Sequence, residues 1–238
     1  MTAHVPVRVG VYGGTFNPIH LAHLILAEDV RDRLGLDRVL FVPSNLPPHK
    51  GESLPSGAAR LALVRLAIRG NPGFGAVDLE VRRGGLSYTI DTLRALAGPR
   101  PGERELYFLI GMDAFAEIRT WHEAGRLAEA ANFAVFPRVG FPLEDPRRHA
   151  PTAWGLGNER RTPEGVRAWR TAAGTRVLLV PTEQLSISAS AVRARAARGA
   201  SIRYLVPPAV ERAIRRDGLY RRGTTGGRAT APRHTKGA

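Results

Sequence analysis

GGTFNPIHLAH, residues 13–23, is the stretch from which the fold of this chain can be worked out. An apolar run, Val5–Tyr12, leads into it, and a helical pattern of apolar residues, Leu21–Leu34, follows it. The segment therefore predicts a strand, a glycine turn and the start of a helix, in that order. Gly13 and Gly14 carry no Cβ, so the backbone can approach a ligand closely at the turn.

The predicted helix start carries two histidines. Asn17 is a good N-cap and Pro18 is favoured as a first helical residue, so His20 and His23 should lie on one face of the first turns. Free N–H groups and the helix dipole make such a helix start a phosphate site, and two imidazoles can donate further hydrogen bonds. The same junction occurs in most parallel α/β proteins, and histidines at this spacing can be ordinary surface residues. Geometry alone therefore leaves a structural role open.

Length and composition limit the class of protein. A chain of 238 residues with 43% hydrophobic content suits one α/β domain with a buried core. The absence of cysteine excludes disulfides, thiolate metal sites and a cysteine nucleophile. No apolar run has the length of a membrane helix, and the N-terminus lacks the features of a secretory signal. A cytoplasmic location is the default expectation.

The net charge of +14 fits either nucleic acid or phosphate-rich substrates. The segment 221–238 holds four arginines and one lysine without an acid, so five of these charges lie outside the expected fold. Lys50 and Lys236 are the only lysines, which indicates a compositional bias towards arginine. These two observations argue against nucleic acid as a partner. The tail has no apolar residue larger than alanine after Tyr220, and we expect it to be disordered.

Alternating apolar segments predict a Rossmann-like, doubly wound parallel α/β sheet in a single domain, residues 1–220, with C-terminal helices. Strands are expected at Val5–Tyr12, Val39–Pro43, Val77–Val81, Leu106–Ile110, Phe133–Phe136 and Val177–Val180. Helices are expected at His20–Leu34, Ala58–Arg69, Thr89–Leu96, within Ala114–Ala131, and at Ala189–Arg198 and Pro208–Arg216. The segment 138–175 is rich in proline, glycine and arginine, which predicts a long surface loop or insertion with a short helix near 165–172.

Three further motifs fall where this sheet would bind ligands. PPHK, residues 47–50, follows the second strand and presents the only lysine of the expected fold on a stiff loop. SYT, residues 87–89, begins a helix whose free amides can receive an anion. Asp113 follows a buried strand and can accept hydrogen bonds from ribose hydroxyls or interact with magnesium indirectly. A rigid turn, a capped helix and a solvated acid would look the same, so each motif is weak by itself.

A second candidate phosphate-binding site, in addition to residues 13–23, lies near the C-terminus. Ser188 is a plausible N-cap, and the first-turn amides, the hydroxyls of Ser188 and Ser190, and Arg193 one turn later can cradle a triphosphate. A capped amphipathic helix with an exposed arginine is the structural alternative.

Taken together, these motifs resemble the nucleotidyltransferase superfamily and, within it, the bacterial nicotinate mononucleotide adenylyltransferase family. Residues 13–23 match its glycine-glycine-x-phenylalanine and double-histidine motif, with Ala22 where the family usually has glycine. The segments 47–50, 87–89 and 111–121 resemble its acceptor motifs, and 188–193 resembles its closing motif, with Ala189 and Ser190 replacing a serine and a threonine.

The resemblance implies transfer of the adenylyl group of ATP to nicotinate mononucleotide, which gives nicotinate adenine dinucleotide and pyrophosphate for NAD biosynthesis. It implies that His20 and His23 are catalytic and contact the α- and β-phosphates, while Lys50 and Arg193 neutralise charge on the remaining phosphates. Trp121 would stack on the nicotinate ring. Amides at Thr89 and His122 would hold its carboxylate. The implied ATP-binding residues are Gly13, Gly14, Thr15, Phe16, His20, His23, Gly111, Asp113, Ser188, Ser190 and Arg193. The implied acceptor-binding residues are Asn45, His49, Lys50, Thr89, Trp121 and His122.

The implied cofactor is Mg²⁺, which substrate phosphates and water would hold, without a protein metal site. Nicotinamide mononucleotide and phosphopantetheine are alternative acceptors, although SYT and Trp121 argue against phosphopantetheine. A basic nucleic-acid-binding protein is the alternative from a different class. The expected partners are ATP and nicotinate mononucleotide, with no membrane, and the sequence leaves a homo-oligomer open.

Overall fold

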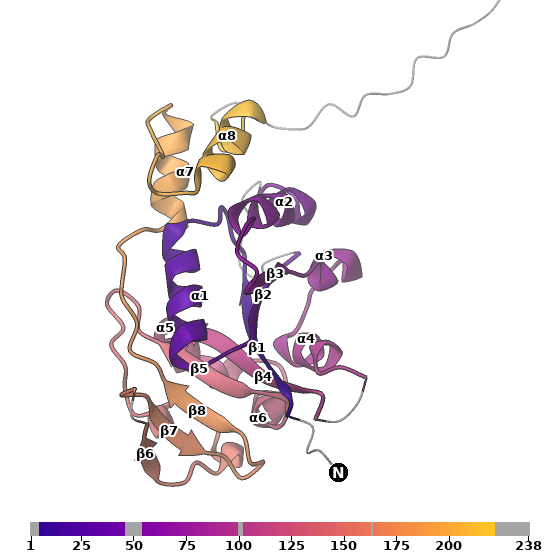
Figure 1. The fold of residues 1–238 in the computed structure, drawn as a ribbon, viewed down its shortest axis with the longest axis vertical. Coiled ribbons are helices and arrows are strands. Elements are labelled where there is room, and N and C mark those ends of the chain that lie inside the picture. The colour runs from indigo at the N-terminus through magenta and orange to yellow at the C-terminus, as the bar shows by residue number, and fades with distance from the viewer. Residues whose placement is uncertain (1–4, 46–53, 100–101, 163, 222–238) are drawn as a thin grey trace, which may run out of the picture.

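The computed structural model describes residues 5–45, 54–99, 102–162 and 164–221, which form one eight-stranded sheet with helices on both faces (Figure 1). The strands are β1 (Val7–Gly14), β2 (Arg38–Pro43), β3 (Phe74–Ala76), β4 (Arg104–Gly111), β5 (Asn132–Phe136), β6 (Glu159–Arg161), β7 (Arg167–Arg170) and β8 (Arg176–Leu179). The α-helices are α1 (Leu21–Arg33), α2 (Gly57–Ala67), α3 (Leu79–Arg83), α4 (Thr89–Leu96), α5 (Met112–Ala116), α6 (Leu127–Ala130), α7 (Ala189–Ala197) and α8 (Pro208–Arg216). Four short 3₁₀ turns cover Ile118–Thr120, Ala124–Arg126, Pro146–Arg148 and Thr152–Trp154.

The sheet is parallel over most of its width. Its strand order is β3-β2-β1-β4-β5-β8-β7-β6, and every pair from β3 to β8 is parallel. The chain moves from β1 to β2 on one side and returns later to β4 on the other. Ligands of such sheets bind beside the carboxyl ends of the strands at this reversal. The predicted α/β Rossmann-like fold is confirmed, and it places the expected site beside β1 and β4.

Both faces of the sheet are buried, as a parallel sheet between helices requires. Along β4, Leu106 and Phe108 pack into one core, whereas Tyr107 and Leu109 pack into the other. Helix α1 lies on one side of the sheet, and α3 and α4 lie on the other (Figure 1). Side chains of β4 therefore pack into the cores on both faces of the sheet, which explains why polar and apolar residues do not alternate along this strand.

The two C-terminal helices stand at the carboxyl end of β1. Figure 1 shows α7 above α1, and α8 beside α2. The N–H of Leu21, at the start of α1, donates to the carbonyl of Leu205 between α7 and α8 at 2.9 Å. Arg193 of α7 donates to the carbonyl of Asn17 at 2.9 Å. The C-terminal segment thus holds the beginning of α1 in place.

The strand predicted at Val77–Val81 is wrong. The edge strand β3 comes earlier, and Leu79 and Val81 belong to the short helix α3. Alternating apolar residues suggested a strand, but β3 has already completed this edge of the sheet. The N–H of Val77 makes a last bond to the carbonyl of Phe41 at 2.9 Å, after which the chain turns away.

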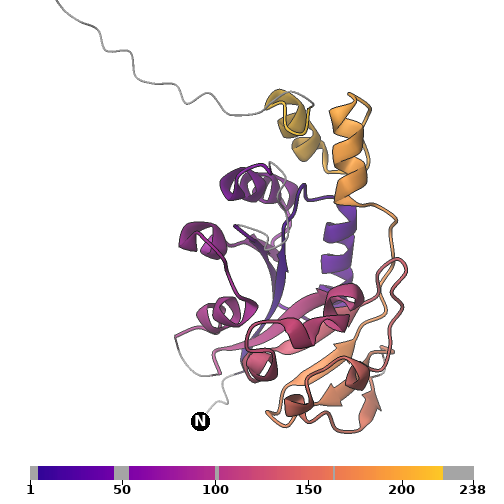
Figure 2. The same cartoon turned by 180° about the vertical axis from the view of Figure 1, so that it is seen from behind.

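The segment 138–175 contains more regular structure than the long surface loop or insertion that its composition predicts. It supplies β6 and β7, which form an antiparallel hairpin against β8, and its two tryptophans, Trp154 and Trp169, are buried. The helix predicted at 165–172 is therefore wrong. The sequence shows little hydrophobic periodicity here, because β6 consists of charged residues and Trp169 is the only buried residue of β7. Figures 1 and 2 place this hairpin far from α2 and α8.

Within the described ranges, no helix is long and apolar enough to cross a membrane. The expected tail lies outside the described residues except for Arg221.

Candidate functional site

The turn after β1 differs from the prediction at its helix start. Helix α1 begins at Leu21 with His20 as its N-cap, so Asn17 is not the cap and Pro18 is not the first helical residue. Phe16 adopts a left-handed backbone with φ of 45°, which turns the chain before a helix can begin. Asn17 and His20 are buried in this turn.

The two histidines are held against each other. The rings of His20 and His23 stack with their centroids 3.7 Å apart and their planes at 28°. The backbone N–H of His20 donates to Nδ1 of His23 at 3.2 Å. A neutral imidazole carries its proton on the nitrogen that does not accept, so Nε2 of His23 is a hydrogen-bond donor.

Both imidazoles are uncharged at neutral pH. Burial lowers the pKa of His20 to about 4, and the charge of Arg138 acts in the same direction. Burial also holds the pKa of His23 well below its usual range, with His20 and Arg138 adding to the effect. Two neutral rings can stack closely because they do not repel each other, and each still offers one N–H group.

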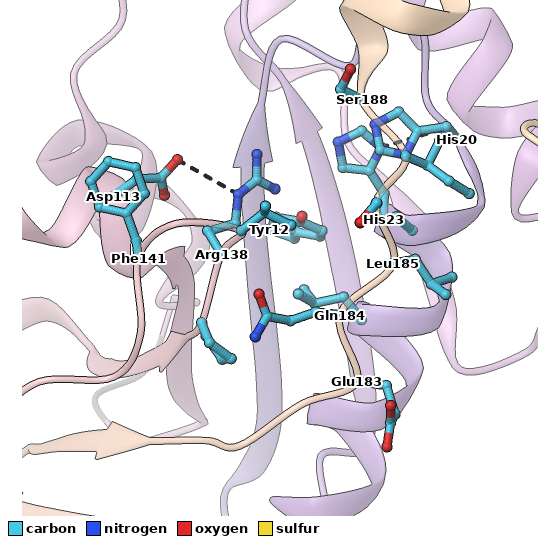
Figure 3. Close-up of a pocket in the computed structure, with 16 residues that line it drawn as sticks. Tyr12, His20, His23, Asp113, Arg138, Phe141, Glu183, Gln184, Leu185 and Ser188 are labelled. Carbon is cyan, nitrogen blue, oxygen red and sulfur yellow. Dashed lines mark hydrogen bonds and ion pairs between the residues drawn. The ribbon is translucent and has the colours of Figure 1, made fainter.

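A first cavity of about 290 Å³ opens beside the histidines (Figure 3). One wall comes from β1 and α1, and the opposite wall comes from the chain after β5 and the segment before α7. Its charged and polar lining includes both histidines and Ser188, while Phe141 and Leu185 supply exposed apolar surface. The remaining lining residues are Tyr12, Ala22, Leu26, Asp113, Pro137, Arg138, Val139, Glu183, Gln184, Ser186 and Ile187.

A second cavity of about 210 Å³ lies between the carboxyl ends of β1 and β4. The glycine turn and the end of β4 form its walls, and Trp121 lines it. It shares Tyr12, His23, Asp113 and Arg138 with the first cavity. The other lining residues are Gly13, Gly14, Thr15, Phe16, Phe108, Leu109, Ile110, Gly111, Ala114 and Phe136. The two cavities therefore adjoin along one wall, and this wall contains the candidate catalytic residue His23.

An ion pair stands in this shared wall. Nε of Arg138 lies 3.6 Å from Oδ2 of Asp113, and Figure 3 shows the pair facing the histidines across the cavity. A Cβ at Gly111 would collide with the Asp113 carboxylate and lie 2.9 Å from Cγ of Arg138. Glycine at position 111 therefore leaves the room that the ion pair occupies.

The closing motif is divided between the cavity and the turn. Ser188 lines the first cavity, and its hydroxyl accepts from the N–H of Ala191 at 3.2 Å as the N-cap of α7. Ser190 is exposed and lines neither cavity. Arg193 also lies outside both linings, where its bond to Asn17 supports the turn beneath the histidines.

The expected acceptor residues gather only in part. Trp121 lines the second cavity and meets the Phe108 ring edge-on, with centroids 6.0 Å apart. Thr89 begins α4 beside Tyr88, whose ring stacks on His122 at 4.1 Å. Thr89, His122 and Asn45 line neither cavity, and His49 and Lys50 lie outside the described residues.

Sequence reasoning missed four residues of this region: Tyr12, Arg138, Phe141 and Arg60. Arg138 follows β5 at the carboxyl edge of the sheet, which is the position that made Asp113 a candidate. Arg60 is an arginine on the apolar stripe of α2, beside the buried Leu61 and Val64. Both signals were present in the sequence, whereas nothing local indicated that Phe141 would line the first cavity.

The described residues contain no group of three or more histidine and carboxylate side chains that could hold a metal ion. The carboxylates that line the first cavity are Asp113 and Glu183.

A cytidylyltransferase-like family model matches residues 11–195 of the chain. A protein of Trichlorobacter lovleyi named a probable nicotinate-nucleotide adenylyltransferase is 43% identical over 217 residues, which cover 90% of this chain and 99% of that protein. A protein of Syntrophotalea carbinolica with the same name is 44% identical over 218 residues, with coverage of 90% and 98%.

The fold is similar to that of Plasmodium falciparum nicotinic acid mononucleotide adenylyltransferase complexed with NaAD. The TM-score is 0.69 at 20% sequence identity, and the match covers 90% of this chain and 97% of the other.

Proposed function

The chain belongs to the nicotinate-nucleotide adenylyltransferase family, and we propose from this premise that it joins the adenylyl group of ATP to nicotinate mononucleotide. The products are nicotinate adenine dinucleotide and pyrophosphate, so the enzyme serves NAD biosynthesis. The observation that carries the assignment is the pair of adjoining cavities with His23 in their shared wall.

The first cavity is the proposed ATP site. It contains both histidines and Ser188 from the two phosphate motifs, and Phe141 and Leu185 offer apolar surface to a base. The second cavity is the proposed acceptor site, because Trp121 lines it and can stack on a pyridine ring. Residues 13–16 and Gly111, which the family resemblance implies bind ATP, also line this cavity and not the first, so we propose that its glycine wall borders the phosphates of ATP. The acceptor phosphate and the α-phosphate of ATP would then meet at the wall that contains His23.

The reaction needs positioned donors rather than a base. A phosphate oxygen of the mononucleotide attacks the α-phosphorus of ATP and forms a new P–O bond. The bond between the α-phosphorus and the oxygen that bridges it to the β-phosphate breaks, and this oxygen leaves with the pyrophosphate. The attacking oxygen is already anionic at neutral pH. Negative charge grows on the leaving pyrophosphate, and Nε2–H of His23 and the neutral ring of His20 can donate to it. Arg138 supplies a fixed positive charge in the same wall.

Magnesium fits this site as an ion carried on the phosphates of ATP. Asp113 and Glu183 are the carboxylates available in the first cavity, and Asp113 already faces Arg138. Such a donor set suits Mg²⁺ that keeps water and phosphate ligands. When bound, Mg²⁺ would neutralise phosphate charge.

The test is release of pyrophosphate from magnesium-ATP with nicotinate mononucleotide, nicotinamide mononucleotide or phosphopantetheine as acceptor. We expect turnover with the nicotinate acceptor and less with the others. The proposal fails if no mononucleotide supports turnover. Light scattering on the same preparation measures the oligomeric state. A cytoplasmic location stays a prediction.

A further inference from the structure

Tyr12 lies near the carboxyl end of β1, directly before the glycine turn, and packs into the core that lies under α1. Its ring lies 5.6 Å from that of Phe41 on the neighbouring strand and 6.0 Å from that of Phe136 on β5, measured between centroids. Phe16 contacts it edge-on at 5.5 Å. The residue is 6% exposed, so these aromatic contacts hold the ring in one direction.

The side chain of Tyr12 reaches the wall that the two cavities share. Tyr12 lines both cavities, as do His23, Asp113 and Arg138. Figure 3 shows Tyr12 between Arg138 and His23, and the centroids of the Tyr12 and His23 rings are 6.0 Å apart. Arg138 and Asp113 pair with each other across 3.6 Å. The phenol therefore adds a polar group to the wall beside this ion pair.

The phenol of Tyr12 is a hydrogen-bond donor at neutral pH. Burial raises the pKa of Tyr12 above its ordinary value, the charge of Arg138 opposes this shift, and the charge of Asp113 adds to it. The hydroxyl group therefore keeps its proton and can donate it in a hydrogen bond. Because both charges of the shared wall act on the phenol oxygen, this end of the side chain lies towards that wall.

We propose that Tyr12 is a catalytic residue whose hydroxyl group donates a hydrogen bond to a non-bridging oxygen of the transferred phosphate. The inference rests on the proposed function, which places ATP in the first cavity and the mononucleotide in the second. During the transfer, the α-phosphorus is bonded to groups in both cavities, so a donor in their shared wall is well placed to contact its oxygens. The proton stays on the phenol throughout, and the hydrogen bond stabilises charge while one P–O bond forms and the other breaks.

The first experiment measures binding and does not depend on turnover. Tyr12→Phe keeps the ring and its aromatic contacts and removes only the hydroxyl group. Tyr204→Phe is the matched control, because Tyr204 is 81% exposed and lines neither cavity. Isothermal titration calorimetry compares nicotinate adenine dinucleotide, which contains the transferred phosphate, with nicotinate mononucleotide, which lacks it. We expect the Kd of the dinucleotide to rise about tenfold or more in Tyr12→Phe, and that of the mononucleotide to stay within about threefold.

The second experiment separates the hydroxyl group from the packing of the ring. Tyr12→Phe should lower kcat/KM for pyrophosphate release by about tenfold or more and keep the melting temperature within about 2 °C of the wild type. Tyr12→Leu also removes the ring and should lower the melting temperature by about 4 °C or more. A merely structural role of the hydroxyl group would reduce the number of binding sites in the calorimetry of Tyr12→Phe and leave the affinity of each site unchanged.

The two proposals fail in distinguishable ways. If the wild type and Tyr204→Phe release no pyrophosphate with any mononucleotide, the proposed function is wrong, and the role of Tyr12 falls with it. If both are active and Tyr12→Phe equals them in turnover and in affinity for the dinucleotide, the proposed function stands and the role of Tyr12 is wrong. An equal loss of affinity for dinucleotide and mononucleotide would also contradict a contact with the transferred phosphate.

Discussion

Buried polar side chains gather beneath the turn that follows β1. Asn17, His20 and Arg60 are each at most 3% exposed, whereas most buried residues of this protein are apolar. Side-chain atoms of Asn17 and Nδ1 of His20 have no hydrogen-bond partner among the described residues. Such groups are costly in a folded protein, and they are retained where a site needs donors held in advance of the ligand.

His20→Ala should lower kcat by about a hundredfold or more, because a preorganised donor to the phosphates is removed. His149→Ala is the matched control, since that histidine pairs with Glu144 outside both cavities. Steady-state kinetics and thermal unfolding of both variants check the prediction. Near-normal turnover of a folded His20→Ala enzyme would remove His20 from the mechanism.

Acid should destabilise the protein through the same residue. The unfolded chain takes up a proton at His20 near pH 6.5, but the folded protein resists until about pH 4, so the free energy of unfolding falls as the pH decreases across this interval. The full effect is about 3 kcal/mol at most. Urea unfolding between pH 7 and 4.5 should show a flatter pH dependence in His20→Asn than in the wild type. Parallel curves would contradict the prediction.

The candidate site residues that the structure brings to the cavities are mainly those whose chemistry is local. His20, His23 and Asp113 follow directly from the ends of β1 and β4 and the spacing of the motif. Arg60 and Arg138 had positional signals in the sequence, the apolar stripe of α2 and the end of β5, but they were missed because an arginine is normally assigned to the surface.

At the scale of elements, the β6–β7 hairpin extends the sheet beyond its parallel part. Arg167 lies over the ring of Trp169 at 5.0 Å from its centroid, and Trp169 is completely buried. The strands β6 and β7 have only three and four residues, and many of their side chains are charged, so the alternation of polar and apolar residues that marks a strand cannot be recognised. The composition of the segment therefore suggested a loop. The longer elements, such as α1 and β4, were predictable because many residues repeat the pattern.

Two tryptophans should respond differently to the same substitution. Trp169→Ala should lower the free energy of unfolding by about 3–5 kcal/mol, because a large core side chain is removed. Trp121→Ala should cost less stability, since Trp121 is only partly buried, and should raise the KM for the mononucleotide by about tenfold. Chemical unfolding and kinetics of both variants test this. Equal stability losses with unchanged KM would refute the assignment of Trp121.

At the scale of the whole molecule, the strand order determines where chemistry can occur. The reversal between β1 and β4 brings the glycine turn to the same edge as Asp113 and Trp121, although about a hundred residues of sequence separate the turn from these two. This convergence was predictable from the alternation of strands and helices. The packing of α7 and α8 against the start of α1 was not, because it depends on contacts such as Leu21 with Leu205.

Removal of residues 222–238 should leave the adenylyl transfer activity unchanged within about twofold, since the described residues that line both cavities all precede that segment. If the basic tail binds nucleic acid, the full chain should show weak binding that declines steeply with salt, and the shortened chain should not. Filter binding at several salt concentrations and the pyrophosphate assay make the comparison. Loss of activity on truncation would show that the tail belongs to the enzyme.

The wall shared by the two cavities also has a consequence for the kinetic mechanism. Each cavity has walls of its own besides Tyr12, His23, Asp113 and Arg138, so neither substrate has to build the site of the other. Either can enter first, yet the phosphates react only when both are present. Double-reciprocal plots should therefore intersect rather than run parallel. Labelled pyrophosphate should not exchange into ATP until a mononucleotide is added.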